Sequence, residues 1–236
     1  MDSSPFRFKQ FVVHQDKCAM KISTDAVLLG AWVKAGHAKK ILDIGTGTGV
    51  IALMLAQKSV ALIDAIEIDS ESCTQARHNF GNSPWKGRLR VIHGYLQEYK
   101  KNSPIKYDLI VSNPPYFDDA YLASVETRNI AKHNETLSFD DIISGVNALL
   151  SEGGRFCVIL PSMESGVFRS KAIQEGLYCS RIARVKTKTE KQEKRILMEF
   201  CNALSACVQE EFSIHDESLQ YTKEFIELTK DYYLAF

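Results

Sequence analysis

The sequence lacks an excess of either charge, because 29 lysine and arginine residues balance 29 aspartate and glutamate residues. This balance argues against a protein that binds nucleic acid with its whole surface. The chain also lacks any apolar run close to the ~18 residues of a membrane span, and residues 1–10 contain no apolar signal segment. We therefore expect no membrane partner.

The six cysteines include no C-x-x-C pair, and none has a histidine nearby at the spacing of metal ligands. This pattern disfavours a zinc site, so we expect no metal. A chain of 236 residues is long enough to bury a core without a disulfide framework. The expected location is the reducing cytoplasm.

Two stretches depart from the neutral average charge. Residues 1–40 carry a net charge of +4, and residues 181–195 carry a net charge of +5. Solvated faces are the ordinary explanation, but two basic patches also allow local binding of a polyanion. The basic residues of the second stretch are Arg181, Arg184, Lys186, Lys188, Lys191, Lys194 and Arg195.

Short apolar runs alternate with amphipathic stretches from residue 40 onward. The runs are nearly continuous in Ile, Leu and Val, which is typical of strands covered on both faces. They are Lys40–Ile44, Ala61–Ile68, Leu89–His93, Asp108–Ser112 and Arg155–Leu160. The stretches between them predict helices over Val50–Lys58, Ser70–Asn82 and Ser138–Leu150, the last ended by Gly153-Gly154. This order predicts an α/β fold with a mostly parallel, doubly wound sheet, whose ligands bind at the carboxyl ends of the strands.

The flanks of this pattern differ from its centre. Short β-prone pieces within Phe6–Ile22 precede an expected helix over Thr24–Val33, which we interpret as a cover over the sheet. Near the other end, Leu177–Lys188 and Arg195–Ala203 predict paired strands, and Tyr221–Asp231 predicts a helix. Without an internal repeat or a linker, we expect a single domain over residues 1–236, with 1–36 as an N-terminal cover segment and 37–236 as the core.

A glycine-rich loop, Gly45-Thr46-Gly47-Thr48-Gly49, follows the first predicted core strand directly. Glycines here allow a tight turn and let a ligand approach the backbone closely. The dinucleotide fingerprint requires a further glycine at the position of Val50, so a nicotinamide dehydrogenase is opposed. No Lys-Ser/Thr pair follows the glycines, which excludes the phosphate-binding P-loop.

An acidic residue, Glu67, ends the next predicted strand and can accept both hydroxyls of a ribose; Asp69 is the second choice. Together, Asp43, Gly45, Gly47, Gly49 and Glu67 resemble the S-adenosylmethionine-binding motifs of the Rossmann-like class I methyltransferases. This resemblance implies S-adenosylmethionine as the cofactor and a seven-stranded sheet whose last strand is antiparallel.

The fourth predicted strand breaks into Asn113-Pro114-Pro115-Tyr116. The side-chain oxygen of Asn113 and the carbonyl of Pro114 can accept hydrogen bonds from a planar amine and aim its lone pair at a methyl donor. The prolines stiffen the backbone, and Tyr116 offers a ring on which an extruded base can stack. The segment resembles the signature of methyltransferases that act on adenine, on guanine or on glutamine amides, and no separate general base is required.

Most of the chain resembles the bacterial valine-tRNA adenine methyltransferases, which modify the adenine next to the anticodon. The matching segments include residues 8–11, 18–21, 24–32, 51–57, 82–85, 156–161 and 232–236. The resemblance implies that Thr24 and Asp25 contact the methionine end of the cofactor and that the partner is tRNA, whose phosphates the basic patches suit. We expect the protein to act as a monomer.

One position departs from this family. Its members usually carry an aspartate after the third strand, where it is expected to meet the adenine amine of the cofactor, but this chain has Tyr95. Either a neighbouring group makes that contact or the cofactor binds more weakly. Two other functions stay open: a protein glutamine methyltransferase, because the same motif can hold an amide nitrogen, and a non-catalytic RNA-binding module with this fold.

Overall fold

The computed structural model of the chain describes residues 4–115 and 137–236. Its centre is an eight-stranded sheet with the strand order β10-β8-β9-β7-β6-β3-β4-β5. The strands of this sheet are β3 (Lys40–Ile44), β4 (Leu62–Glu67), β5 (Leu89–His93), β6 (Tyr107–Ser112), β7 (Leu150–Pro161), β8 (Tyr178–Lys188), β9 (Glu193–Cys201) and β10 (Val208–His215). The five core strands predicted from their apolar runs are therefore confirmed.

A single strand of this sheet, β9, runs antiparallel to its neighbours β7 and β8, whereas β10 pairs with β8 in parallel. The antiparallel strand expected of the class I sheet is thus present, but it is β9, the seventh strand of this sheet along the chain, and not the last. The sheet has one strand more than the predicted seven, because β10 extends it beyond β8.

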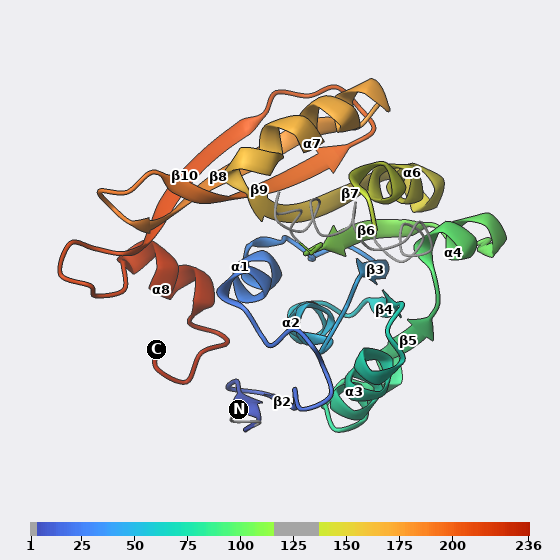
Figure 1. The fold of residues 1–236 in the computed structure, drawn as a ribbon, viewed down its shortest axis with the longest axis horizontal. Coiled ribbons are helices and arrows are strands. Elements are labelled where there is room, and N and C mark those ends of the chain that lie inside the picture. The colour runs from blue at the N-terminus through green and yellow to red at the C-terminus, as the bar shows by residue number, and fades with distance from the viewer. Residues whose placement is uncertain (1–3, 116–136) are drawn as a thin grey trace, which may run out of the picture.

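Helices cover both faces of the sheet (Figure 1). One face carries α1 (Thr24–Trp32), α2 (Val50–Gln57), α3 (Ser70–Gly81) and α8 (Lys223–Thr229), and the other carries α4 (Leu96–Asn102), α6 (Phe139–Leu149) and α7 (Ser162–Gln174). Successive residues of a strand point to opposite faces. Ile41 accordingly belongs to the hydrophobic cluster beneath α1 and α2, and Leu42 to the cluster beneath α6 and α7. The three-layer architecture is the predicted one.

The end of α6 differs from its prediction. The helix begins after Ser138, whose side chain accepts the backbone N–H of Asp141 in a capping box, and it ends at Leu149. Gly153 and Gly154 do not terminate it. They lie within β7, where Gly153 has a φ of 69° and the register against β6 shifts, so that they form an irregularity of the strand.

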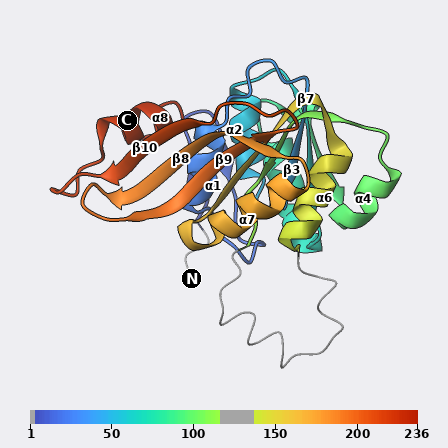
Figure 2. The same cartoon turned by 90° about the horizontal axis from the view of Figure 1, so that it is seen from above.

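Strand β10 is attached to helix α1 through the buried side chain of Arg181. The guanidinium of Arg181 on β8 lies 3.6 Å from the centroid of the Trp32 ring and 3.6 Å from carboxylate oxygens of both Glu199 and Glu210. The indole N–H of Trp32 donates to Glu210 at 2.7 Å. Charge pairing therefore joins β10 to α1, at the end of the molecule where Figure 2 shows β8, β9, β10 and α8 together.

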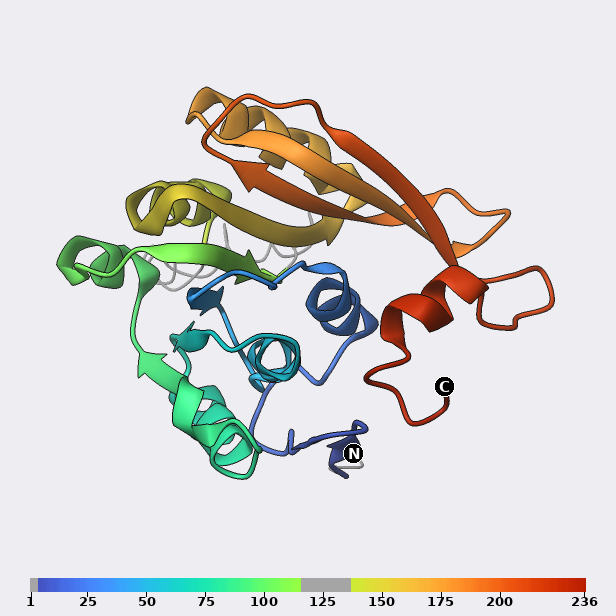
Figure 3. The ribbon, with the colours of Figure 1, turned by 180° about the vertical axis from the view of Figure 1, so that it is seen from behind.

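The two ends of the described chain lie on the same side of the molecule (Figure 3). A small hairpin of β1 (Phe6–Arg7) and β2 (Val12–Val13) precedes α1, and the short helix η1 (Lys86–Arg88) precedes β5. Phe8 forms an antiparallel bridge with Tyr233 near the C-terminus. In residues 4–115 and 137–236, no helix is long and apolar enough to cross a membrane, and no cluster of metal-ligand side chains occurs.

Candidate functional site

The carboxyl ends of three neighbouring strands bring the predicted site residues together. Ile44, near the end of β3, pairs with Ile66 of β4 on one side and with Ser112 of β6 on the other. Adjacent strands lie about 5 Å apart. The residues that follow, namely Gly45, Glu67 and Asn113, therefore stand side by side at one edge of the sheet.

The loop from Gly45 to Gly49 turns β3 into α2 with a backbone that ordinary side chains disfavour. Gly47 has a φ of 52°, and Gly49, which caps α2, has a φ of 84°. The backbone N–H of Gly47 donates to Glu67 Oε2 at 2.9 Å. The side chain of Asn79 on α3 donates to the carbonyl oxygen of Thr48, which fixes the loop from behind. The loop therefore presents backbone, and not side chains, toward this edge.

Asp43 lies beneath the glycine loop and is completely buried. Its Oδ2 atom accepts a hydrogen bond of 2.6 Å from the hydroxyl of Thr46. Burial raises the pKa of this carboxyl to about 7, although the Thr46 hydroxyl and the backbone N–H of Ala52 oppose the shift. Asp43 therefore holds the loop through Thr46, while its other oxygen, Oδ1, has no hydrogen-bond partner among the described residues, so that its role toward the cofactor stays a prediction.

Glu67 has its carboxylate fixed by three backbone donors. In addition to Gly47 at one oxygen, the N–H groups of Ile68 and Asp69 donate to Oε1 at 2.9 and 3.0 Å. Asp69, the second choice from the sequence, instead caps α3 by accepting the N–H of Ser72 at 2.7 Å, which holds the pKa of Asp69 below its ordinary value. Glu67 is thus the carboxylate that stands at the pocket.

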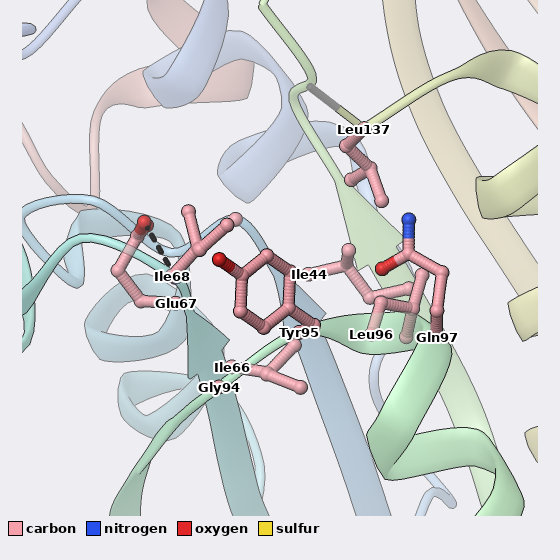
Figure 4. Close-up of a pocket in the computed structure, with 10 residues that line it drawn as sticks. Ile44, Ile66, Glu67, Ile68, Gly94, Tyr95, Leu96, Gln97 and Leu137 are labelled. Carbon is pink, nitrogen blue, oxygen red and sulfur yellow. Dashed lines mark hydrogen bonds between the residues drawn. The ribbon is translucent and has the colours of Figure 1, made fainter. Parts of the chain in front are cut away.

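A pocket adjoins Glu67 (Figure 4). Its apolar walls come from Ile44, Ile66, Ile68, Leu96 and Leu137. Gly45 of the glycine loop also lines the pocket, and Gly94, Tyr95 and Gln97, from the turn between β5 and α4 and the first turn of α4, complete the lining. An apolar slot beside a fixed carboxylate suits a nucleoside, whose flat base is apolar on its faces and whose ribose offers two hydroxyls.

Sequence reasoning did not find the contribution of Gln97 and Leu137 to this pocket. The only signal near them is the departure at Tyr95, whose ring lines the pocket and is 38% exposed. Leu137 is the first residue of the described range 137–236 and is 40 positions from Gln97 in the chain, so that only the fold brings the two residues together.

Asn113 follows β6 at the same edge, and its side-chain oxygen accepts no hydrogen bond from the described residues. Ser112 anchors this strand end by donating from its hydroxyl to the carbonyl oxygen of Ile44 at 3.0 Å. The side-chain oxygen of Asn113 is buried, and no described residue donates to it. Pro114 is buried and Pro115 is exposed. Tyr116, the predicted stacking residue, lies outside the described residues.

Thr24 and Asp25 line a different pocket from Glu67. They stand at the start of α1, where Asp25 Oδ2 accepts a hydrogen bond of 2.7 Å from Nε of Arg195. Their pocket includes residues of β8, β9, β10 and α8, and it shares no lining residue with the pocket beside Glu67. The structure therefore brings together the glycine loop, Glu67 and Asn113, whereas the cofactor contact expected of Thr24 and Asp25 stays a prediction.

Structural comparison supports the class I fold. A predicted O-methyltransferase from Agrobacterium tumefaciens superposes with a TM-score of 0.64 over 88% of this chain and 96% of that chain, at 18% identity. A ribosomal protein L11 methylase from Lactobacillus delbrueckii subsp. bulgaricus superposes with a TM-score of 0.54 over 79% of this chain and 82% of that chain, at 17% identity.

Sequence comparison identifies the family. Residues 18–163 match the model of the methyltransferase small domain. The tRNA1(Val) (adenine(37)-N6)-methyltransferase of Bacteroides fragilis strain YCH46 is 45% identical over 97% of both chains, and that of Trichodesmium erythraeum is 45% identical over 100% of both chains. The one from Flavobacterium psychrophilum is 46% identical over 97% of this chain and 99% of its own. The chain therefore belongs to the family of bacterial tRNA1(Val) (adenine(37)-N6)-methyltransferases, within the class I S-adenosylmethionine-dependent methyltransferases.

Proposed function

We propose that this protein transfers a methyl group from S-adenosylmethionine to the exocyclic N6 amine of adenine 37, next to the anticodon of a valine tRNA. The relatives named for this reaction match nearly the whole chain. The observation that carries the proposal is the buried side-chain oxygen of Asn113, beside the glycine loop and Glu67, to which none of the described residues donates a hydrogen bond. An acceptor without a donor at the ligand-binding edge suits a substrate amine, because a buried polar atom otherwise loses a hydrogen bond.

The cofactor would be held by the backbone of the glycine loop and by Glu67. When bound, S-adenosylmethionine supplies an electrophilic methyl group. The Glu67 carboxylate, already oriented by three backbone N–H groups, retains one acceptor site on Oε2 with which to accept a ribose hydroxyl. The loop leaves space close to its backbone, since a Cβ at Gly45 or Gly47 would meet no atom within 4 Å.

Asn113 and Pro114 would orient the substrate amine. The lone pair of an adenine amine is delocalised into the ring, so the amine is a weak nucleophile. Hydrogen bonds from the amine to Asn113 Oδ1 and to the Pro114 carbonyl would favour its pyramidal form in the transition state. Tyr116 would stack on the extruded base.

The tRNA backbone would meet lysines at the turn between β8 and β9. Arg195 in β9 pairs with Pro161 at the carboxyl end of β7, which puts this turn at the same edge of the sheet as Asn113. Several other cations of the second basic patch are already paired: Arg181 with Glu199 and Glu210, Lys186 with Glu211, and Arg195 with Asp25. Lys188, Lys191 and Lys194 have no carboxylate partner among the described residues and are the candidates for phosphate contacts.

Three sequence-based expectations accompany this proposal. We propose that residues 1–236 act as one domain, because Phe8 and Phe11 of the N-terminal segment share a hydrophobic cluster with Ile41 and Leu109 of the sheet. The cytoplasmic location and the monomeric state stay predictions.

The proposal is tested by methylation of a defined substrate in vitro. Purified protein, labelled S-adenosylmethionine and an unmodified valine tRNA transcript should yield about one methyl group per tRNA, and a transcript with guanine at position 37 should yield none. Methylation of the altered transcript at the same level would refute the position. Labelling of a glutamine in a protein substrate, with unlabelled tRNA, would favour the protein glutamine methyltransferase.

The role of Asn113 is tested by N113A. Loss of the side-chain acceptor should lower kcat by about 100-fold or more, the usual effect of removing one oriented transition-state contact. The dissociation constant of S-adenosylhomocysteine, measured by calorimetry, should change by less than about threefold, since Asn113 acts on the amine. N102A, at an exposed asparagine that ends α4, is the matched control and should keep full activity. An N113A enzyme with wild-type kcat would contradict the proposed role.

A further inference from the structure

The side-chain amide of Gln97 lies in the pocket that Glu67 also lines. Gln97 belongs to the first turn of α4 and is half-buried. No residue in the described part of the chain forms a hydrogen bond with its amide, whose oxygen and nitrogen Figure 4 shows at the pocket, near Leu137. A pocket-facing amide that the protein itself does not use is available to a ligand.

The place of Gln97 relative to Glu67 decides which part of a nucleoside it would meet. Glu67 would take a ribose hydroxyl, and the base is bonded directly to the ribose. The base therefore has to enter the neighbouring apolar slot, whose walls include Ile44, Ile68 and Leu96. Such walls contact the two faces of a flat ring but cannot distinguish the groups on its edge.

Among the described residues that line the pocket, only two side chains apart from Glu67 offer hydrogen-bonding groups to the edge of the base. They are Gln97 and Tyr95. In Figure 4 the Tyr95 hydroxyl points toward Ile68, whereas the Gln97 amide lies on the side of Leu137. A carboxamide carries an acceptor and a donor side by side, which matches the exocyclic amine and the adjacent ring nitrogen of adenine. A tyrosine hydroxyl is a single group and cannot match both.

We propose that Gln97 is the residue that recognises the adenine of the cofactor, with its oxygen accepting from the 6-amino group and its nitrogen donating to the adjacent ring nitrogen. This inference rests on the proposed use of S-adenosylmethionine. It answers the question raised by Tyr95: the ring of Tyr95 forms part of the slot, and the contact expected of an aspartate at that position passes to the side chain two residues further along.

Binding measurements with two ligands test this recognition without requiring turnover. Calorimetry should compare S-adenosylhomocysteine with its analogue in which hydrogen replaces the 6-amino group. The wild type should bind the amino form about tenfold more tightly, because the analogue leaves the Gln97 oxygen unpaired. Q97A should reduce this preference to less than about twofold. Q97E keeps an acceptor oxygen and should keep the preference. E98A, at the exposed neighbouring position of α4, should match the wild type.

The outcomes separate this inference from the proposed function. If the wild type binds neither ligand, both the cofactor assignment and the inference fail. If both ligands bind but Q97A keeps the wild-type preference, or Q97E loses it as completely as Q97A, the inference alone is overturned. Loss of the preference in Y95F, with Q97A unaffected, would assign the recognition to the tyrosine hydroxyl and would also overturn it.

Discussion

Two carboxylates at the same sheet edge have opposite surroundings and therefore different uses. Asp43 is enclosed, and the Thr46 hydroxyl is the only side chain that donates to it within the described residues. Glu67 accepts three backbone N–H groups at the border of a pocket. Burial disfavours a charge, whereas several donors favour it. Asp43 is suited to holding the loop, and Glu67 is suited to binding hydroxyl groups.

The raised pKa of Asp43 predicts a pH-dependent stability. Because the pKa of about 7 in the folded protein exceeds the ordinary value of 3.8, the folded state holds this proton more tightly than the unfolded state. The contribution of Asp43 to stability is therefore complete below about pH 4, and it falls as the pH rises to about 7, by at most about 1.4 kcal/mol per pH unit. Urea unfolding of the wild type and of D43N across this range should show a flatter profile for D43N.

Asp108 provides a control, because its pKa is shifted in the opposite direction from that of Asp43. Burial tends to raise its pKa, but the backbone N–H groups of Lys39 and Lys40 and the hydroxyl of Ser151 hold it below the ordinary value. The contribution of Asp108 is thus present at neutral pH and is lost as the pH falls, so D108N should flatten the acid side of the profile. Identical profiles for D43N and the wild type would contradict the assignment of Asp43.

At the scale of elements, the turn from β3 into α2 depends on two glycines for different reasons. Both have positive φ angles. A Cβ at Gly47 would meet no atom within 4 Å, whereas a Cβ at Gly49 would lie 2.5 Å from Cε1 of Phe80 on α3. Glycine is therefore needed at position 47 for its backbone conformation alone. At position 49 it is needed both for the backbone conformation and because a side chain would clash with Phe80.

Alanine substitutions separate these two requirements. G47A should cost about 1 kcal/mol of unfolding free energy, the strain of a left-handed residue. G49A should cost about 2–4 kcal/mol, because overpacking against Phe80 is added. Urea unfolding of both variants checks the difference, and F80L in the G49A background should recover part of the loss. Equal losses for the two variants would refute the packing argument.

Elements that the sequence did not predict have few or no fully buried residues. In α7 only Phe168 and Ala172 are buried, so its apolar periodicity is weak. The short helix α4 buries only Leu96, and its N-cap, Tyr95, forms no side-chain cap bond. The edge strand β10 has no fully buried residue. The core strands and α6, by contrast, bury continuous or periodic apolar residues, and their positions followed from the sequence.

At the scale of the whole molecule, Lys39 and Lys40 of the first basic patch lie at the opposite edge of the sheet from the lysines of the second basic patch. Lys188, Lys191 and Lys194 lie around the turn between β8 and β9, at the edge that carries Asn113. Lys40 begins β3 and therefore stands with Lys39 at the opposite edge, where the N–H groups of both donate to Asp108. A balanced net charge thus conceals a local basic surface beside the candidate site.

This separation predicts unequal effects of two triple substitutions on RNA binding. Replacing Lys188, Lys191 and Lys194 with alanine should weaken tRNA binding and lower the slope of log affinity against log salt by about 2–3, roughly one unit per lost phosphate contact. Replacing Lys34, Lys39 and Lys40, which are all exposed, should leave both quantities near wild type. Filter binding across a salt series checks this, and equal losses for the two variants would contradict the assigned surface.

The sequence by itself determined the α/β fold and indicated the glycine loop, Glu67 and the Asn113-Pro114 segment as the candidate site, because each depends on residues that are close in the chain. Only the tertiary structure decided which groups share a pocket. It brought Glu67, Gln97 and Leu137 to the lining of one pocket, placed Asp69 at the N-cap of α3, and paired Asp25 with Arg195. These outcomes depend on strand order and register, which bring together residues separated by many positions in the chain and which no local pattern records.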